Sequence, residues 1–149
     1  MEDGKVNDFQ ELVRKYTVLV SNRIYGKQLN GQLVNVIFLQ VITNHGEPLN
    51  ASAINRTLFV GTKHELQCPL IEYNGVLFDK FYMTPRAWST IVHEITHFEV
   101  NVQLRGKQII HPQKFKTTYK GNLARVKDLR KNFYMEAKTL RQANPKPLL

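Results

Sequence analysis

The sequence predicts an α+β fold with an N-terminal helix, a small and mostly antiparallel sheet of three to four strands, a helix that contains an H-E-x-x-H motif, and C-terminal helices. Apolar residues recur at helical spacing near the N-terminus and again after residue 84, and β-branched apolar runs lie between these regions. The length of 149 residues is typical of one domain. We expect the domain to span residues 1–142, followed by a flexible tail at 143–149.

The N-terminal helix is predicted by seven apolar residues that form one stripe: Phe9, Leu12, Val13, Tyr16, Leu19, Val20 and Ile24. Asn7 or Asp8 can cap its start, and Gly26 can end it. We therefore expect an amphipathic helix that packs on a sheet.

The middle of the chain has the pattern of a sheet. We expect a buried strand at residues 34–42, a polar loop at 43–53 and a second strand at 56–62. Asn74-Gly75 separates two apolar runs, and this dipeptide favours a type I′ turn. The sequence therefore predicts a hairpin over residues 70–78, whose second strand can continue to Tyr82.

The segment His93-Glu94-Ile95-Thr96-His97 carries the H-E-x-x-H pattern of zinc proteases. Residues four apart lie on one face of a helix, so both imidazoles can bind a single Zn²⁺. Glu94 is then placed to take a proton from the water that the metal activates. The pattern predicts a zinc-dependent peptidase.

The helix that carries this motif is predicted to run from Pro85 to Leu104, with Thr84 as its N-cap. One face is apolar and is expected to pack on the sheet; it consists of Trp88, Ile91, Val92, Ile95, Phe98 and Val102. His93 and His97 lie on the opposite side. The helix can thus be held by one face while it presents a metal site on the other.

Two helices are expected after Gly106. The first is short, begins at Pro112 and is closed by Gly121, and Asn122 can cap the second. The apolar stripe of the second helix consists of Val126, Leu129, Phe133, Ala137 and Leu140.

A catalytic zinc usually has three protein ligands, so a third is expected besides His93 and His97. His111 fits best, because the residues after Leu104 are numerous enough to return to the metal. Glu136 on the last helix is an alternative ligand. Cys68 is a third candidate, although a small buried thiol is the interpretation that we prefer.

The net charge of +9 is concentrated in the last third of the chain. Residues 1–104 contain 9 Lys/Arg and 10 Asp/Glu, whereas residues 105–149 contain 12 Lys/Arg and 2 Asp/Glu. Such a field attracts polyanions, DNA among them, although a solvated helical face has the same pattern. The candidate contacts lie opposite the apolar stripe of the last helix: Lys127, Lys131, Lys138 and Arg141.

Cysteine content and hydropathy predict the compartment. A single cysteine excludes an intrachain disulfide and is typical of a reducing environment. The sequence shows no secretion signal and no apolar run as long as a membrane span. We therefore expect a cytoplasmic protein, or one in the nucleoid or nucleus, with no membrane partner.

The motif, its spacer and the segment His111-Pro112-Gln113-Lys114-Phe115-Lys116 resemble the SprT-like metalloproteases. That family has a second box in which His opens a helix and an aromatic residue follows; here Pro112 replaces the usual Gly, and Phe115 matches the aromatic position. The resemblance implies a minimal zincin-like fold, Zn²⁺ held by His93, His97 and His111, and a DNA-linked role. The zinc ribbon of many members needs C-x-x-C pairs, which this sequence lacks.

The resulting hypothesis is a zinc-dependent metallopeptidase that acts on a protein or peptide and is recruited to DNA by its basic last third. Tyr119, Tyr134 or Arg86 is expected to stabilise the oxyanion, and the substrate is expected to pair as an added strand along residues 76–82. The alternative is a basic nucleic-acid-binding protein with a structural or inactive zinc site.

Overall fold

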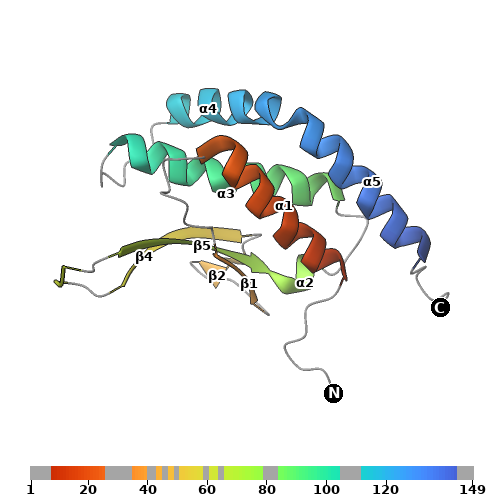
Figure 1. The fold of residues 1–149 in the computed structure, drawn as a ribbon, viewed down its shortest axis with the longest axis horizontal. Helices are drawn as coiled ribbons and strands as arrows, with labels where there is room; N and C mark the ends of the chain where they lie inside the picture. The colour runs from red at the N-terminus through yellow and green to blue at the C-terminus, as the bar shows by residue number, and fades with distance from the viewer. Residues whose placement is uncertain are drawn as a thin grey trace, which may run out of the picture.

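The computed structural model describes residues 8–25, 35–39, 43–44, 47–48, 51–58, 61–63, 66–78, 84–104 and 112–143, and these form an α+β fold. The elements in chain order are α1 (Asp8–Tyr25), β1 (Asn35–Leu39), β2 (Thr43–Asn44), β3 (Glu47–Pro48), β4 (Ala51–Leu58), β5 (Leu66–Asn74), α2 (Gly75–Phe78), α3 (Thr84–Leu104), α4 (Pro112–Arg125) and α5 (Lys127–Ala143). The longer helices lie on one side of the sheet, with α1 and α3 nearer to the strands and α4 beyond α3 (Figure 1). The predicted class is confirmed.

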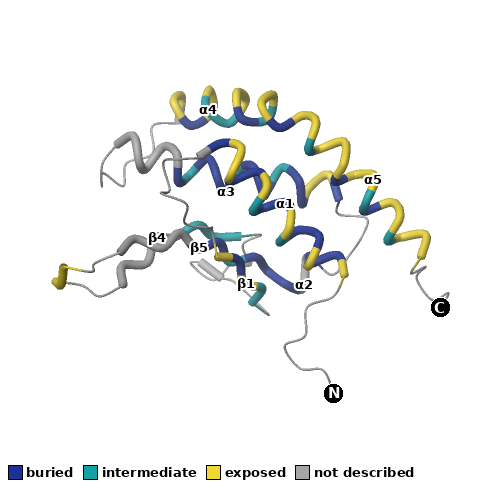
Figure 2. Tube along the Cα trace, in the orientation of Figure 1, coloured by how far each residue is buried: buried dark blue, intermediate teal, exposed yellow. Residues whose placement is uncertain are grey.

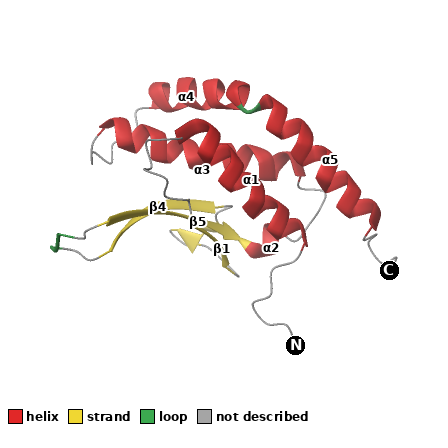
Figure 3. Ribbon diagram, in the orientation of Figure 1, coloured by secondary structure: helices red, strands yellow, loops and turns green. Residues whose placement is uncertain are grey.

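The main sheet is mixed rather than mostly antiparallel. The main sheet has the strand order β1-β5-β4 (Figure 3), with β1 parallel to β5 and β4 antiparallel to β5. β2 and β3 form a separate two-stranded pair. The antiparallel pair is a local hairpin, and Gly61 at its turn has a φ of 79°, which an L side chain rarely adopts. The parallel pair joins segments far apart in sequence, so local patterns do not specify it.

The predicted hairpin over residues 70–78 is wrong, because β5 ends at Asn74 and the helix α2 follows at once. Gly75 is needed for close packing instead of a turn. A Cβ on Gly75 would lie 3.0 Å from the carbonyl oxygen of Leu39, and the Gln10 side chain donates a hydrogen bond of 3.0 Å to the Gly75 carbonyl. Because glycine has no side chain, the chain can pass from β5 into α2 while it packs closely on β1 and α1.

The predicted strand boundaries were also shifted. The strand expected at residues 34–42 is described only as β1, at Asn35–Leu39, where Ile37 is exposed and Val36 is buried. The expected loop at 43–53 contains β2, β3 and the start of β4, so β4 begins five residues before the predicted strand at 56–62. β1 lies at an edge of the sheet, which explains why it is only half-buried.

Three aromatic rings from three helices form the centre of the core. Trp88 of α3 lies with its ring centroid 6.3 Å from that of Tyr16 in α1 and 5.4 Å from that of Phe133 in α5. Tyr16 and Phe133 are 5.2 Å apart in an edge-to-face arrangement. Trp88, on the apolar face of α3, therefore packs on α1 and α5, whereas the sequence predicted that this face packs on the sheet.

The predicted apolar stripes are largely confirmed by burial (Figure 2). In α1 the predicted residues are buried except Leu19, which is 37% exposed. In α3 the predicted residues are buried as far as Phe98, and the side chain of Val102 lies outside the described residues. A buried contact of 2.8 Å between the hydroxyls of Thr17 and Tyr73 ties α1 to β5.

The two C-terminal helices are almost continuous, so Gly121 does not end the first of them. α4 runs on to Arg125, and backbone hydrogen bonds from Val126 to Asn122 and from Arg130 to Val126 carry the helical pattern into α5. Asn122 is therefore not an N-cap. Its buried side-chain amide instead donates a hydrogen bond of 3.0 Å to the Thr96 hydroxyl, which links α4 to α3.

Among the helices that the structure describes, none combines the length and the apolar character needed to cross a membrane. The predicted tail at 143–149 lies outside the described residues from position 144 onward.

Replacement of Thr96 by Val is expected to destabilise the fold by about 1–3 kcal/mol, because the buried Asn122 amide loses the oxygen that accepts its hydrogen bond. Urea unfolding measures this change. Thr139→Val is the matched control, since Thr139 also bonds to the carbonyl one turn earlier but is exposed; it should change stability by less than about 0.5 kcal/mol. Equal effects of the two substitutions would contradict the assigned link between α3 and α4.

Candidate metal centre

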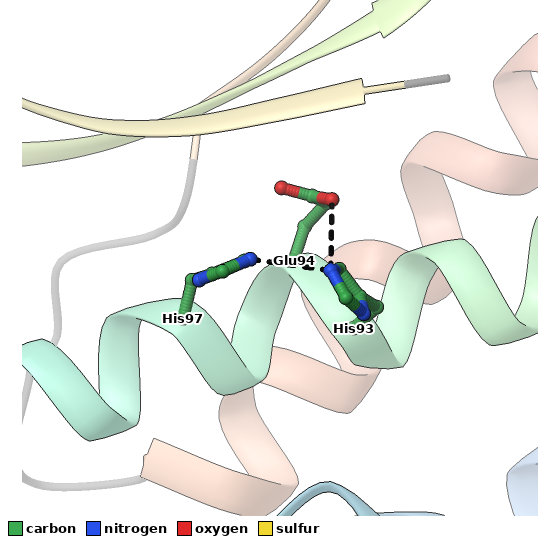
Figure 4. A group of neighbouring side chains, drawn as sticks. All are labelled: His93, Glu94 and His97. Carbon is green, nitrogen blue, oxygen red and sulfur yellow. Dashed lines mark hydrogen bonds and ion pairs between the residues drawn. The ribbon is translucent and has the colours of Figure 1, made fainter. Parts of the chain in front are cut away.

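His93 and His97 lie one turn apart on α3 with their rings turned toward one another (Figure 4). Their Nε2 atoms are 3.2 Å apart. Two ligand nitrogens at 2.0–2.1 Å from a tetrahedral Zn²⁺ would be separated by about 3.3 Å. The spacing of the two imidazoles thus fits a shared metal ion, as the H-E-x-x-H pattern predicted.

Glu94 completes a group of three residues that could hold a metal ion. The ligand atoms of His93, Glu94 and His97 all lie within 4.8 Å of one another, and Glu94 Oε2 is 3.9 Å from His93 Nε2. In Figure 4 the Glu94 carboxylate points toward the strands, above the line that joins the two imidazoles. Imidazole nitrogen and carboxylate oxygen suit zinc and other first-row divalent ions.

Burial controls the protonation of these three groups. It raises the pKa of Glu94 to about 7, and this residue is only 6% exposed. Burial, followed by the neighbouring His93, lowers the pKa of His97 to about 4, and burial also lowers the pKa of His93. Both imidazoles are therefore neutral near pH 7, which is the state that binds a metal.

An aromatic wall from α4 covers the histidine pair. The Phe115 ring centroid is 4.8 Å from that of His93 and 4.6 Å from that of His97, and Phe115 is buried. Tyr119 lies one turn later, with its ring 5.7 Å from His93. Phe115 and Tyr119 are four residues apart and therefore share one face of α4, but nothing in the sequence predicted that Phe115 contacts both imidazoles.

A cavity of about 360 Å³ opens beside the motif. Its lining consists of Ala51, Arg86, Ser89, Thr90, His93, Glu94 and Tyr119. Two of the three predicted oxyanion donors, Arg86 and Tyr119, therefore share a cavity with Glu94. Sequence patterns missed Ser89 and Thr90, although their spacing from His93 already placed them near the same side of the helix.

Glu136 is not a ligand of this site, contrary to the alternative considered above. Its carboxylate accepts a hydrogen bond of 3.0 Å from Lys15 Nζ and a short one from the Tyr16 hydroxyl. Partial burial opposes ionisation, but these two donors outweigh it and lower the pKa of Glu136. The carboxylate thus joins α5 to α1.

Tyr134 also lies away from the cavity. It is 37% exposed and does not line the cavity, and the Arg130 guanidinium lies 5.9 Å from its ring centroid. It is therefore not an oxyanion donor. His111 and the side chain of Cys68 lie outside the described residues, so the third ligand remains a prediction.

The predicted nucleic-acid contacts on α5 divide into two groups. Lys127, Lys131 and Lys138 are exposed, as expected for the solvent face of the helix. Arg141 instead donates a hydrogen bond of 3.1 Å to the Thr84 hydroxyl at the start of α3. Its guanidinium is thus engaged within the fold.

No protein-family model matches the sequence, and the searches of curated proteins and of solved structures found no match either.

In the metal-free protein, Glu94→Gln is expected to increase the free energy of unfolding by about 2–3 kcal/mol more at pH 8 than at pH 5. Burial raises the Glu94 pKa from 4.5 to about 7, so ionisation of the buried carboxylate lowers stability as pH rises through this window, and Gln does not ionise. Urea unfolding in the presence of a chelator measures the difference.

Glu136→Gln is the control of opposite sign for this prediction. The pKa of Glu136 is lowered, so its ionised form stabilises the fold above its ordinary pKa, and this contribution is lost as pH falls. The substitution should reduce stability more at pH 8 than at pH 4. If the effect of Glu94→Gln on stability does not change with pH, the pKa of the Glu94 carboxyl is not raised by burial.

Proposed function

We propose that the chain is a zinc-dependent metallopeptidase whose metal is held by His93, His97 and His111. The observation that carries the proposal is the 3.2 Å separation of the two Nε2 atoms, with Glu94 beside them at the wall of a cavity. A helix, a small sheet and the motif helix follow one another in the order that the SprT-like metalloproteases suggest. We extend the proposal to a minimal zincin-like fold of that family.

The third ligand in this proposal is His111. It precedes Pro112 in the sequence, and Pro112 is the first residue of α4. Phe115, in the first turn of α4, contacts both imidazoles, so the start of that helix lies beside the histidine pair. This proximity supports His111 over Glu136, which is engaged with Lys15 and Tyr16.

Zinc, when bound, would act as a Lewis acid on the peptide carbonyl and lower the pKa of a water molecule toward 7. Glu94 would accept a proton from the attacking water and deliver it to the leaving amine as the C–N bond breaks. Tyr119, in the same cavity, would donate a hydrogen bond to the carbonyl oxygen as negative charge develops there.

The edge strand β4 is the proposed docking strand for an extended substrate. The earlier expectation of a docking strand at residues 76–82 is wrong for Val76–Phe78, which belong to the helix α2, and residues 79–82 lie outside the described residues. β4 forms one edge of the sheet within the described residues, and Ala51 at its start lines the cavity. An edge strand offers unpaired backbone groups, and a peptide can use them as an added strand.

Metal analysis combined with proteolysis of an unfolded labelled protein tests this function. Protein purified without added zinc should contain about one Zn²⁺ per chain, and His93→Ala should lose it. Glu94→Gln should retain the metal but lose activity by about 10²–10⁴-fold, because the proton acceptor is gone. Full activity of Glu94→Gln, or zinc content unaffected by His93→Ala, would refute the proposal.

A specific charge arrangement favours a second candidate function, the binding of nucleic acid. The two acidic residues of α5 are paired with α1: Asp128 with Arg23 at 2.9 Å, and Glu136 with Lys15. Among the residues that the structure describes, the lysines on the solvent face of α5 form no ion pair with an acidic side chain, so their charge is directed outward. Such a surface attracts phosphates, and recruitment to DNA would be compatible with peptidase activity.

The combined substitution of Lys127, Lys131 and Lys138 by Gln is expected to weaken binding of a 20-base-pair DNA duplex. The logarithm of the binding constant falls with the logarithm of the salt concentration, and each lost phosphate contact should make this negative slope less steep by about 0.9. Fluorescence anisotropy at several salt concentrations measures this, and Glu94→Gln should bind DNA like the unmodified protein. An unchanged slope in the triple variant would remove α5 as the DNA-binding surface.

A further inference from the structure

Arg86 lies on the same face of α3 as the candidate metal site. Seven residues separate it from His93, which corresponds to almost two helical turns and a rise of about 10 Å. Arg86 is exposed and lines the same cavity as His93 and Glu94. One cavity therefore has an arginine toward one end and the histidine pair toward the other.

The Arg86 guanidinium has no carboxylate partner among the residues that the structure describes. The ion pairs of the described arginines involve Arg14 and Arg23. Glu94 is the one acidic residue among the described residues that line the cavity, and it lies about 12 Å farther along the helix axis. The Ser89 hydroxyl bonds to the backbone carbonyl of Arg86, which leaves the guanidinium donors available.

The other lining groups suit a polar ligand that reaches Arg86. Ser89, Thr90 and Tyr119, which carry hydroxyl groups, line the cavity together with Ala51 of the edge strand β4. Arg86 also belongs to the first turn of α3, where the helix dipole adds to the positive potential. A guanidinium in this setting matches a carboxylate in both charge and planar geometry.

We propose that Arg86 binds a carboxylate of the substrate peptide in this cavity, so that peptides with a carboxylate at this position are preferred. This inference rests on the proposed peptidase function. An extended chain rises about 3.3 Å per residue, so the distance of about 10 Å places the carboxylate two or three residues from the scissile bond. It can come from an Asp or Glu side chain or from the C-terminus of the peptide.

The first test measures binding without turnover. Glu94→Gln protein is titrated into fluorescein-labelled ten-residue peptides in which one Glu is moved through successive positions, with Gln as the neutral match and both ends blocked. A further set has a free C-terminal carboxylate and no Glu. The best carboxylate-bearing peptide should bind about tenfold or more tightly than its neutral match, since a charge-assisted hydrogen bond replaces a neutral one. The set that shows the gain identifies the source of the carboxylate.

Substitutions in the same Glu94→Gln background assign the preference to Arg86. Arg86→Gln should bring the affinity ratio of acidic to neutral peptide close to one, and Arg86→Glu should favour a peptide with Lys at the same position. Lys63→Gln removes one exposed positive charge from the turn between β4 and β5 and should keep the tenfold ratio. Equal affinity for acidic and neutral peptides, no binding of either, or a preference that survives Arg86→Gln would overturn the proposal.

The second test measures kcat/KM for the same peptides with the zinc-loaded, otherwise unmodified chain and with Arg86→Glu. A preference for the acidic peptide that reverses toward the Lys peptide in Arg86→Glu supports the carboxylate site. Cleavage that ignores peptide charge would overturn that site and leave the peptidase function standing. Absence of cleavage, together with an Arg86-dependent binding preference, would instead overturn the peptidase function alone.

Discussion

The candidate metal centre depends on how α4 is fixed against α3. A buried hydrogen bond joins the Asn122 amide to the hydroxyl of Thr96, which lies inside the H-E-x-x-H motif. A buried polar pair is stable only when both partners meet, so it specifies one register between the two helices. In that register Phe115 lies on both imidazoles and Tyr119 lines the cavity. The residues that surround the two histidines therefore come in part from α4, which follows α3 in the chain.

The first helix supports this pair of helices from the other side. Tyr16 packs on Trp88 of α3 and Phe133 of α5, and Thr17 bonds to Tyr73 of the sheet. Lys15 and Tyr16 also engage Glu136 of α5. These contacts have two consequences. They hold the motif helix in place by its apolar face, and they neutralise an acidic residue of α5, so the outer face of that helix remains strongly basic.

Local patterns predicted the helices and the pair of histidines, because helical period and i, i+4 spacing are properties of neighbouring residues. These local patterns gave wrong predictions where a residue distant in the sequence determines the conformation or the role of the residue in question. Asn74-Gly75 has the pattern of a hairpin turn, but the close approach of Gly75 to Leu39 makes it the start of a helix. Glu136 has the chemistry of a zinc ligand, but Lys15 and Tyr16, more than 100 residues earlier, determine its role. The contact of Phe115 with both imidazoles is likewise long-range.

The burial of Glu94 is the strongest local conflict in the described part of the fold. Glu94 is 6% exposed, and an ionised carboxylate on such a buried residue is destabilising unless a positive charge is near. No described Lys or Arg forms an ion pair with it. The nearest titratable neighbours are imidazoles whose pKa values are lowered, so they do not supply that charge near pH 7. A divalent cation between the imidazoles would supply it. An apolar residue in place of Glu94 would pack at this buried position without the free-energy cost of a buried charge. Such a conflict is typical of a functional site, because residues that bind or react are retained even where they lower the stability of the empty fold.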